Sequence, residues 1–184
     1  MMAMKTDTQI LEATIFVFAH KPDATMEDVA DKAGVTRLTI NRKFGTKKQL
    51  LEEAQIYSIA QFEQILSRAK KSRKSAMDKF LMVLQEYYHF RDHYFFWMRS
   101  AVDEPSRNKK QYMRQLDGIE KMVRDAQEQG GIRQDLPAGW VASFFDFLII
   151  AASTSRYRGV VAERDMIKLV WDTFQYGVSP NRGF

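Results

Sequence analysis

Helix-breaking residues are few in this chain, and they stand at a small number of places. The 184 residues include four prolines and nine glycines. Between these breaks, apolar residues recur at spacings of three and four, which is typical of amphipathic helices, and no segment alternates in the manner of a strand. The sequence therefore predicts an all-α fold of about nine helices. The breaks that separate these helices are Gly34, Gly45, the Gly130-Gly131 pair, Pro137 and Gly159.

Helical spacing and capping residues place the expected helices along the chain. Four helices are expected over residues 7–20, 26–33, 36–44 and 46–70. Apolar residues then mark five more, at about 77–88, 93–101, 112–126, 138–157 and 167–174. The first three helices are short, so the chain divides into a small three-helix unit and a larger helical region. The boundary is expected between residues 48 and 49.

The second and third helices carry clear start and turn signals. Thr25 and Asp28 have the spacing of a capping box, in which each residue binds a backbone N–H of the other. Gly34 stands at the turn, where glycine tolerates a positive φ, and Thr36 caps the next helix. Ala30 is small enough to let the two helices approach. Two short helices with such a turn predict a helix-turn-helix, which reads the major groove of DNA with its second helix.

Local charge supports a polyanionic partner. The chain carries a formal net charge of +5. From Lys32 to Leu51 there are six basic residues and no acidic one. A positive segment of this kind suits DNA, although charge alone is equally typical of a solvated face.

Side-chain chemistry suggests roles on the third helix and at neighbouring helix starts. Arg37 has the geometry to bind guanine O6 and N7, and Asn41 can pair with adenine N6 and N7. Leu38 or the methyl group of Thr39 suits a thymine methyl. Phosphate contacts are expected elsewhere. The complete set of expected DNA-binding residues is Thr25, Thr36, Arg37, Leu38, Thr39, Asn41, Arg42, Lys43 and Lys47.

These residues carry a family resemblance. A long stretch near the amino terminus closely resembles the amino-terminal domain of TetR-family regulators. It runs from Ile10-Leu11-Glu12-Ala13 through the segment 25–36 to the segment 44–50. The match covers about residues 10–54, and the segment 130–137 is similar to the linker before that family's eighth helix. The resemblance implies an all-helical fold, a homodimer, and repression that a small ligand relieves.

Four positions depart from the pattern of that family, one of them Pro22, which stands where a glycine is common. Leu38 stands where a glycine or another small residue is common, and Asn41 stands where a tyrosine usually touches the DNA backbone. Lys43 replaces a frequent histidine or tyrosine. We therefore expect the helix-turn-helix of the family with an unusual operator.

The eighth and ninth helices are expected to form a dimer interface. The eighth is apolar over most of its circumference, which predicts that it is covered on two sides, once by the core and once by a partner subunit. A monomeric core remains the alternative. A two-fold dimer would present its recognition helices to half-sites about 34–36 Å apart, or a multiple of this distance, and predicts a near-palindromic operator. The expected interface residues are Trp140, Phe144, Phe145, Leu148, Ala152, Trp171 and Phe174.

Aromatic and methionine side chains concentrate in residues 87–98. With neighbours from other helices they suit an apolar pocket for a small ligand, although aromatics at helical spacing are also typical of an ordinary core. Glu86, Asp117 or Asp146 would favour a lipophilic cation if one of them faced the pocket. The candidate lining residues are Phe62, Tyr87, Tyr88, Phe96, Trp97, Met113, Leu116 and Phe147.

Several other classes of protein are disfavoured. The absence of cysteine removes disulfides, thiolate zinc sites and cysteine nucleophiles. Glu86, His89 and His93 have helical metal-ligand spacing, but no cysteine or acidic cluster supports a site, so no metal or cofactor is expected. No phosphate-binding loop or catalytic pair stands out, so no enzyme is expected. The longest apolar run has six residues (147–152), which is too short for a membrane span, and the amino terminus lacks a signal peptide.

The sequence therefore predicts a cytoplasmic, homodimeric DNA-binding regulator. Residues 1–48 would form the DNA-binding domain and residues 49–184 the ligand-binding and dimerisation domain. A small, largely apolar ligand would release the repressor from its operator by shifting the long fourth helix. Two alternatives stay open: a regulator of the same fold controlled by a protein partner or by no ligand, and a helical carrier or enzyme for apolar compounds.

Overall fold

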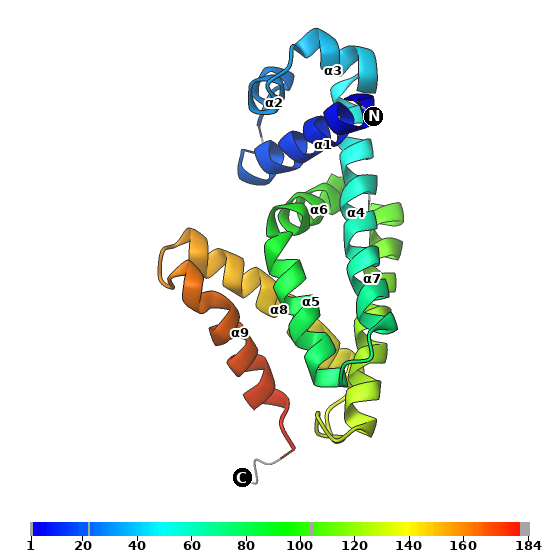
Figure 1. The fold of residues 1–184 in the computed structure, drawn as a ribbon, viewed down its shortest axis with the longest axis vertical. Coiled ribbons are helices and arrows are strands. Elements are labelled where there is room, and N and C mark those ends of the chain that lie inside the picture. Colours follow the sequence, from blue (N-terminus) through cyan, green and yellow to red (C-terminus); the bar gives the residue numbers. More distant parts are fainter. Residues whose placement is uncertain (1, 22, 104, 181–184) are drawn as a thin grey trace. The chain divides into compact units, whose positions relative to one another are not determined.

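The computed structural model describes the backbone of residues 2–21, 23–103 and 105–180, and the side chains of 6–21, 23–97 and 110–180. This part of the chain contains nine helices and no strand (Figure 1), as the helical spacing predicts. The helices are α1 (Met2–His20), α2 (Met26–Ala33), α3 (Arg37–Phe44), α4 (Lys47–Lys71), α5 (Ala76–His89), α6 (Arg91–Asp103), α7 (Pro105–Glu128), α8 (Ala138–Tyr157) and α9 (Glu163–Val178).

The first compact unit comprises residues 1–61 and 92–106. It contains α1, α2, α3, the first part of α4, and α6. Ile10, Val29, Ile40 and Leu50 are fully buried at its centre, one from each of the first four helices. Phe96 of α6 belongs to the same apolar cluster. The unit is therefore larger than the segment 1–48 expected to form the DNA-binding domain, because a helix distant in sequence completes its core.

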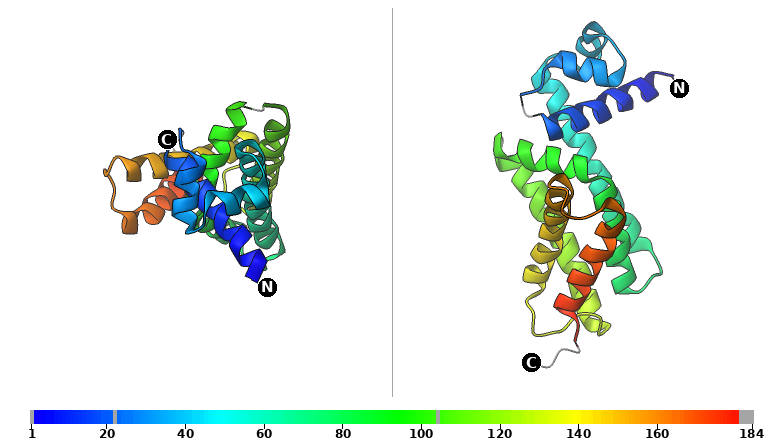
Figure 2. Two further views of the ribbon diagram at one scale, coloured as in Figure 1. Left: turned by 90° about the horizontal axis from the view of Figure 1, so that it is seen from above. Right: turned by 90° about the vertical axis from the view of Figure 1, so that its left-hand side faces the viewer.

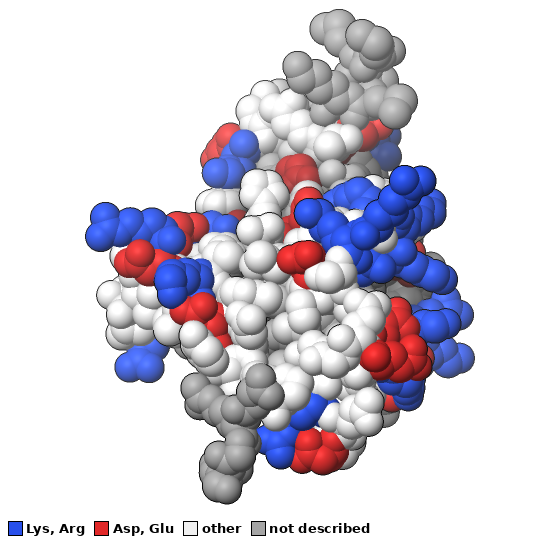
Figure 3. Space-filling view, turned by 60° about the horizontal axis from the view of Figure 1, so that its bottom comes forward, with Lys and Arg blue, Asp and Glu red and all other residues white. Residues whose placement is uncertain are grey.

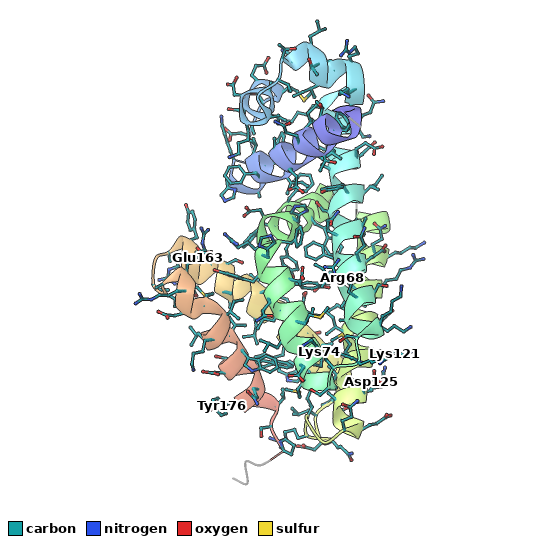
Figure 4. The ribbon with its side chains drawn as sticks, in the orientation of Figure 1. Arg68, Lys74, Lys121, Asp125, Glu163 and Tyr176 are labelled. Carbon is teal, nitrogen blue, oxygen red and sulfur yellow. The ribbon has the colours of Figure 1, made fainter. Side chains whose placement is uncertain are left out.

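The second compact unit comprises residues 62–91 and 107–184. In it, α8 and α9 pack against each other and α5 packs against both (Figures 1 and 2). The rings of Phe80, Phe145 and Phe174 come from these three helices, and their centroids lie 5.0–5.2 Å apart. Glu163, in the first turn of α9, forms ion pairs with Arg91 and Arg156, which fixes the connection from α8 (Figure 4).

Helix α8 is the one helix among the described residues that is long and apolar enough to cross a membrane by length and composition. Its face with Val141, Phe145, Ile149 and Ala152 is buried inside the second unit. Helix α8 packs these apolar residues against α5 and α9, so its apolar composition is that of a core helix in a folded domain.

Helix α7 is longer than the spacing of its apolar residues predicts. Apolar residues mark this helix only over about residues 112–126. Pro105 occupies the first position of α7. Proline is tolerated there because the N–H that it lacks has no partner within the helix. The following residues are polar, so they leave no apolar pattern.

Candidate nucleic-acid interface

A reciprocal cap begins α2. The Thr25 hydroxyl accepts a hydrogen bond from the Asp28 N–H at 3.2 Å, and the Asp28 carboxylate accepts one from the Thr25 N–H at 2.7 Å. The Lys21 ammonium donates to the same carboxylate at 3.0 Å. These donors lower the pKa of Asp28 to about 2, the Thr25 backbone N–H contributing most. The capping box predicted from the sequence is present, and it fixes where α2 starts.

Gly34 makes the turn between α2 and α3. Its φ of 63° and ψ of 34° lie in the left-handed region, which glycine adopts without steric cost. The N–H of Val35 then donates to the carbonyl of Ala30 at 3.0 Å, which closes the end of α2. Val29, Ala30 and Ala33 are buried on the inner face of α2. The close approach of α2 and α3 depends on these small residues and this turn.

Helix α3 presents a polar and exposed outer face. The Thr36 hydroxyl caps it by accepting a hydrogen bond from the Thr39 N–H at 3.2 Å. Ile40 is fully buried and anchors the helix, whereas Leu38 is 76% exposed. Arg37, Asn41 and Arg42 are also exposed, and Thr39 is half-buried. An exposed leucine beside such polar groups is a surface that a partner can cover.

Arg37 is held by an acidic residue of α2. Its guanidinium lies 2.5 Å from a carboxylate oxygen of Glu27, and both side chains are more than half exposed. The pKa of Glu27 is lowered by a backbone hydrogen bond and then by Arg37. To contact DNA, Arg37 would have to leave Glu27 for a base edge or a phosphate. Arg42 forms no ion pair with a carboxylate among the described residues.

Lys43 and Lys47 are tied to other parts of the first unit. The Lys43 ammonium lies 2.5 Å from the Asp7 carboxylate of α1. The Lys47 ammonium donates to the Ala24 carbonyl at 2.7 Å and lies 4.8 Å from the centre of the Phe18 ring. Both ammonium groups therefore have structural roles, and their phosphate contacts stay a prediction.

Two exposed residues at the start of α4 were missing from the predicted set. Thr46 and Gln49 form another reciprocal cap, with the Thr46 N–H donating to the Gln49 side chain at 2.8 Å. Lys48 lies between Thr46 and Gln49 in the chain, and its side chain is 77% exposed. The basic segment and the capping box both point to this helix start, where free backbone N–H groups suit a phosphate.

A partly buried hydrogen-bond network links three helices of the first unit. The Glu12 carboxylate of α1 accepts a hydrogen bond from the Tyr57 hydroxyl of α4 at 2.8 Å and lies 2.9 Å from Nε2 of His93 in α6. Burial and then Glu12 raise the pKa of Tyr57 to about 12. Glu86 instead pairs with Arg68 at 3.1 Å, and His89 is exposed. Within the described residues no cluster suits a metal ion.

The candidate pocket residues fall into separate groups. Phe62 and Tyr87 are buried in the second unit, with ring centroids 4.9 Å apart, and Tyr88 packs on Arg91. Phe96 and Trp97 are buried in the first unit. Leu116 is half-buried, while Met113 and Phe147 are 47% and 57% exposed. The structure therefore brings Phe62 and Tyr87 together but leaves Met113 and Phe147 at the surface.

The predicted dimer residues lie on both sides of α8 and α9. Phe145, Ala152 and Phe174 are buried within the second unit, so a single chain already covers them. Trp140 is 66% exposed. The remaining predicted residues, Phe144, Leu148 and Trp171, are half-buried. Other large apolar residues of α8 and α9 are exposed but were not in the predicted set, among them Phe147, Leu169 and Tyr176.

Known proteins share this sequence pattern and fold. Residues 10–54 match the family described as bacterial regulatory proteins, tetR family. The chain is 20% identical over 176 residues to the HTH-type transcriptional regulator NfxB of Pseudomonas aeruginosa, and the match covers 94% of each. Its fold is similar to that of LfrR from Mycobacterium smegmatis, solved with proflavine (TM-score 0.72, 19% identity, 97% and 98% of the two chains). It is also similar to a transcriptional regulator from Saccharomonospora viridis, solved with choline (TM-score 0.71, 19% identity, 97% of each chain).

The capped helix-turn-helix with its exposed α3, joined to a helical bundle, defines a DNA-binding transcriptional regulator rather than an enzyme. The family match covers the residues that build this unit, and the relatives extend over the rest of the chain. Over residues 10–54 the chain therefore carries the sequence pattern of the tetR family of bacterial regulatory proteins.

Proposed function

We propose that the chain is a homodimeric, cytoplasmic repressor that leaves a near-palindromic operator when a small, largely apolar ligand binds. The observation that carries the DNA-binding part is the outer face of α3, where Arg37, Leu38, Asn41 and Arg42 are all exposed while Ile40 anchors the helix from within. A recognition helix needs this combination of a fixed inner face and a free polar outer face.

We assign base reading to α3 and phosphate binding to the helix starts around it. Arg37 and Arg42 suit guanine, Asn41 suits adenine, and Leu38 or the Thr39 methyl suits thymine. We assign phosphate contacts to the predicted cap and basic residues Thr25, Thr36, Lys43 and Lys47, and we add Thr46 and Lys48 because they are exposed at the start of α4. Glu27 keeps Arg37 in place until DNA replaces it.

An apolar stripe on α8 supports the homodimer. Trp140, Phe144, Phe147 and Ala151 follow one another at spacings of four and three, and two of them are more than half exposed. Leu169 and Tyr176 of α9 are 48% and 58% exposed and stand seven residues apart, so they share one helix face. A second copy of the chain would cover both stripes about a two-fold axis.

A buried carboxylate in the second unit supports ligand control. The Tyr112 hydroxyl of α7 donates to Asp146 of α8 at 2.8 Å, and Asp146 is 1% exposed. Burial, and then the charge of Asp146, raises the pKa of Tyr87 well above its usual value. A carboxylate near the rings of Tyr87 and Phe62 suits an apolar ligand with positive charge. Proflavine and choline, held by two structural neighbours, are both organic cations.

A gel-retention experiment with a random pool of double-stranded DNA tests the DNA-binding surface. The Arg37→Ala/Arg42→Ala variant should lose about tenfold or more in affinity, since a well-placed bidentate arginine contributes about 1–3 kcal/mol. The matched control is Arg158→Ala/Arg164→Ala, which removes the same charge from exposed positions outside the first unit. Equal retention of both variants would overturn the assignment of α3 as the recognition helix.

A further inference from the structure

A concave groove opens on the second unit, apart from the Asp146 region. It has a volume of about 370 Å³ and is walled by α4, the start of α5 and α7. This volume lies within the range of small-molecule sites. Figure 3 shows lysine and arginine side chains gathered on the face that presents the ends of α4 and α7. The groove is lined by Glu63, Leu66, Ser67, Lys70, Lys79, Arg114, Gln115, Gly118, Lys121, Met122 and Asp125.

Positive charge in the groove is not neutralised by ion pairs. Four lining residues are cationic: Lys70, Lys79, Arg114 and Lys121. None of the four forms an ion pair with any residue that the structure describes. Some basic side chains of the same unit are paired, such as Arg68 with Glu86 and Lys168 with Asp172.

Two carboxylates also line the groove, so the groove keeps an excess of positive charge without being purely basic. They are Glu63 of α4 and Asp125 of α7, the latter one helical turn beyond Lys121 (Figure 4). The four cations outnumber the two acids and come from three helices. Their charges therefore act together on any ligand that enters the groove.

The floor of the groove combines apolar surface with one unsatisfied donor. Leu66 and Met122 contribute apolar side chains. Gln115 is 4% exposed, and its amide Nε2 has no hydrogen-bond partner. Buried donors are nearly always satisfied in folded proteins, and leaving one without an acceptor costs about 1–3 kcal/mol. A ligand that brings an acceptor oxygen to this amide would remove that cost.

We propose that this groove binds a small amphiphilic anion, with a phosphate or carboxylate head and a short apolar body. The four cations would hold the head, Gln115 would donate to one of its oxygens, and Leu66 and Met122 would contact the apolar part. A concave site with a buried donor and an apolar floor favours a small molecule over a polyanion, because a nucleic acid backbone needs an extended positive surface. This site is independent of the proposed repressor mechanism and of the ligand proposed near Asp146.

Isothermal titration calorimetry of the full chain without DNA tests the proposal. The probe is hexyl phosphate, compared with inorganic phosphate, hexanol and hexyltrimethylammonium. Hexyl phosphate should bind, and its affinity should exceed that of each comparison compound at least tenfold. Equal binding of the cationic and anionic probes would contradict a site selective for anions, and equal binding of inorganic and hexyl phosphate would contradict the apolar floor.

Variants locate the binding in the groove. Lys70→Gln/Lys121→Gln should weaken hexyl phosphate binding at least tenfold. The matched control, Lys71→Gln/Lys74→Gln, removes the same charge from the neighbouring segment outside the lining and should change the affinity less than twofold. Gln115→Leu keeps the side-chain volume and removes the donor, so it should weaken the phosphate probe while thermal unfolding remains cooperative.

Three outcomes would overturn the proposal: no heat of binding with hexyl phosphate, equal loss in the two double-lysine variants, or unchanged affinity in both Lys70→Gln/Lys121→Gln and Gln115→Leu. If the wild type bound no hexyl phosphate and the Lys70→Gln/Lys121→Gln variant lost affinity for random duplex DNA, the groove would instead be part of a nucleic acid surface. None of these results depends on whether α3 reads an operator.

Discussion

At the scale of single residues, the start of α2 depends on the charge of one carboxylate. Asp28 accepts hydrogen bonds from the Thr25 N–H, the Thr25 hydroxyl and Lys21. These bonds favour the ionised form, which is why the pKa falls from 3.8 to about 2. A carboxyl group whose pKa is lower in the folded state stabilises the fold at pH values above its unfolded pKa.

The first prediction concerns acid unfolding. The contribution of Asp28 should be fully present above about pH 4 and should be lost as the pH falls toward about 2. The difference in unfolding free energy between the wild type and Asp28→Asn should therefore shrink across this range. Urea unfolding at a series of pH values measures it. A difference that stays constant from pH 5 to pH 2 would show that the Asp28 charge does not stabilise the cap.

At the scale of helices, the Glu12 carboxylate connects α1, α4 and α6. Tyr57 and His93 reach it from positions 45 and 81 residues away in the chain. His93 is 4% exposed, whereas the Glu12 side chain is 44% exposed, so the network is buried on the His93 side and open to water at Glu12. Because α1 supports the helix-turn-helix and α4 leads out of the first unit, this network joins elements whose relative movement the proposed ligand control requires.

The second prediction is a double-mutant cycle on this network. Tyr57→Phe removes one hydroxyl and keeps the ring, so it should destabilise the protein by about 1–2 kcal/mol, the low end for a hydrogen bond to a charged group because the Glu12 side chain is 44% exposed. In a Glu12→Gln background the same change should cost much less. Urea unfolding of the four proteins gives the coupling energy. Additive effects would mean that Tyr57 and Glu12 do not stabilise the unit together.

At the scale of the whole molecule, the exposed stripe on α8 predicts the oligomeric state. Phe147→Glu places a charge in the middle of this stripe and should shift the protein to monomers. Tyr157→Glu is the matched control, since Tyr157 is 90% exposed on the same helix but lies off the stripe. Sedimentation equilibrium measures the result. A wild-type monomer, or equal dimerisation of both variants, would contradict the proposed interface.

The sequence predicted interactions between residues that are close together in the chain better than those between distant residues. The caps at Thr25 and Thr36 and the turn at Gly34 involve residues three or four apart, so their types and spacing were sufficient. Which aromatic faces inward was harder, because Phe145 and Phe147 have the same chemistry and differ only in the helix face they occupy.

Pairings between distant residues could not be predicted at all. Lys43 with Asp7 and Glu12 with His93 are separated by 36 and 81 residues. The pairing of Arg37 with Glu27 depends on the angle between α2 and α3, which no spacing rule specifies. The basic groove was also missed, because its cations come from three helices and form no run in the sequence.

The central claim is that a two-fold dimer reads DNA through α3, and selection of bound DNA from a random pool tests it most directly. Repeated rounds with the wild-type protein should enrich a near-palindromic sequence whose half-sites are centred about 34–36 Å apart, or a multiple of this. Binding to it should weaken steeply as salt is raised, because phosphate contacts release counterions. Enrichment of no sequence, or of a single half-site with no symmetric partner, would contradict the account.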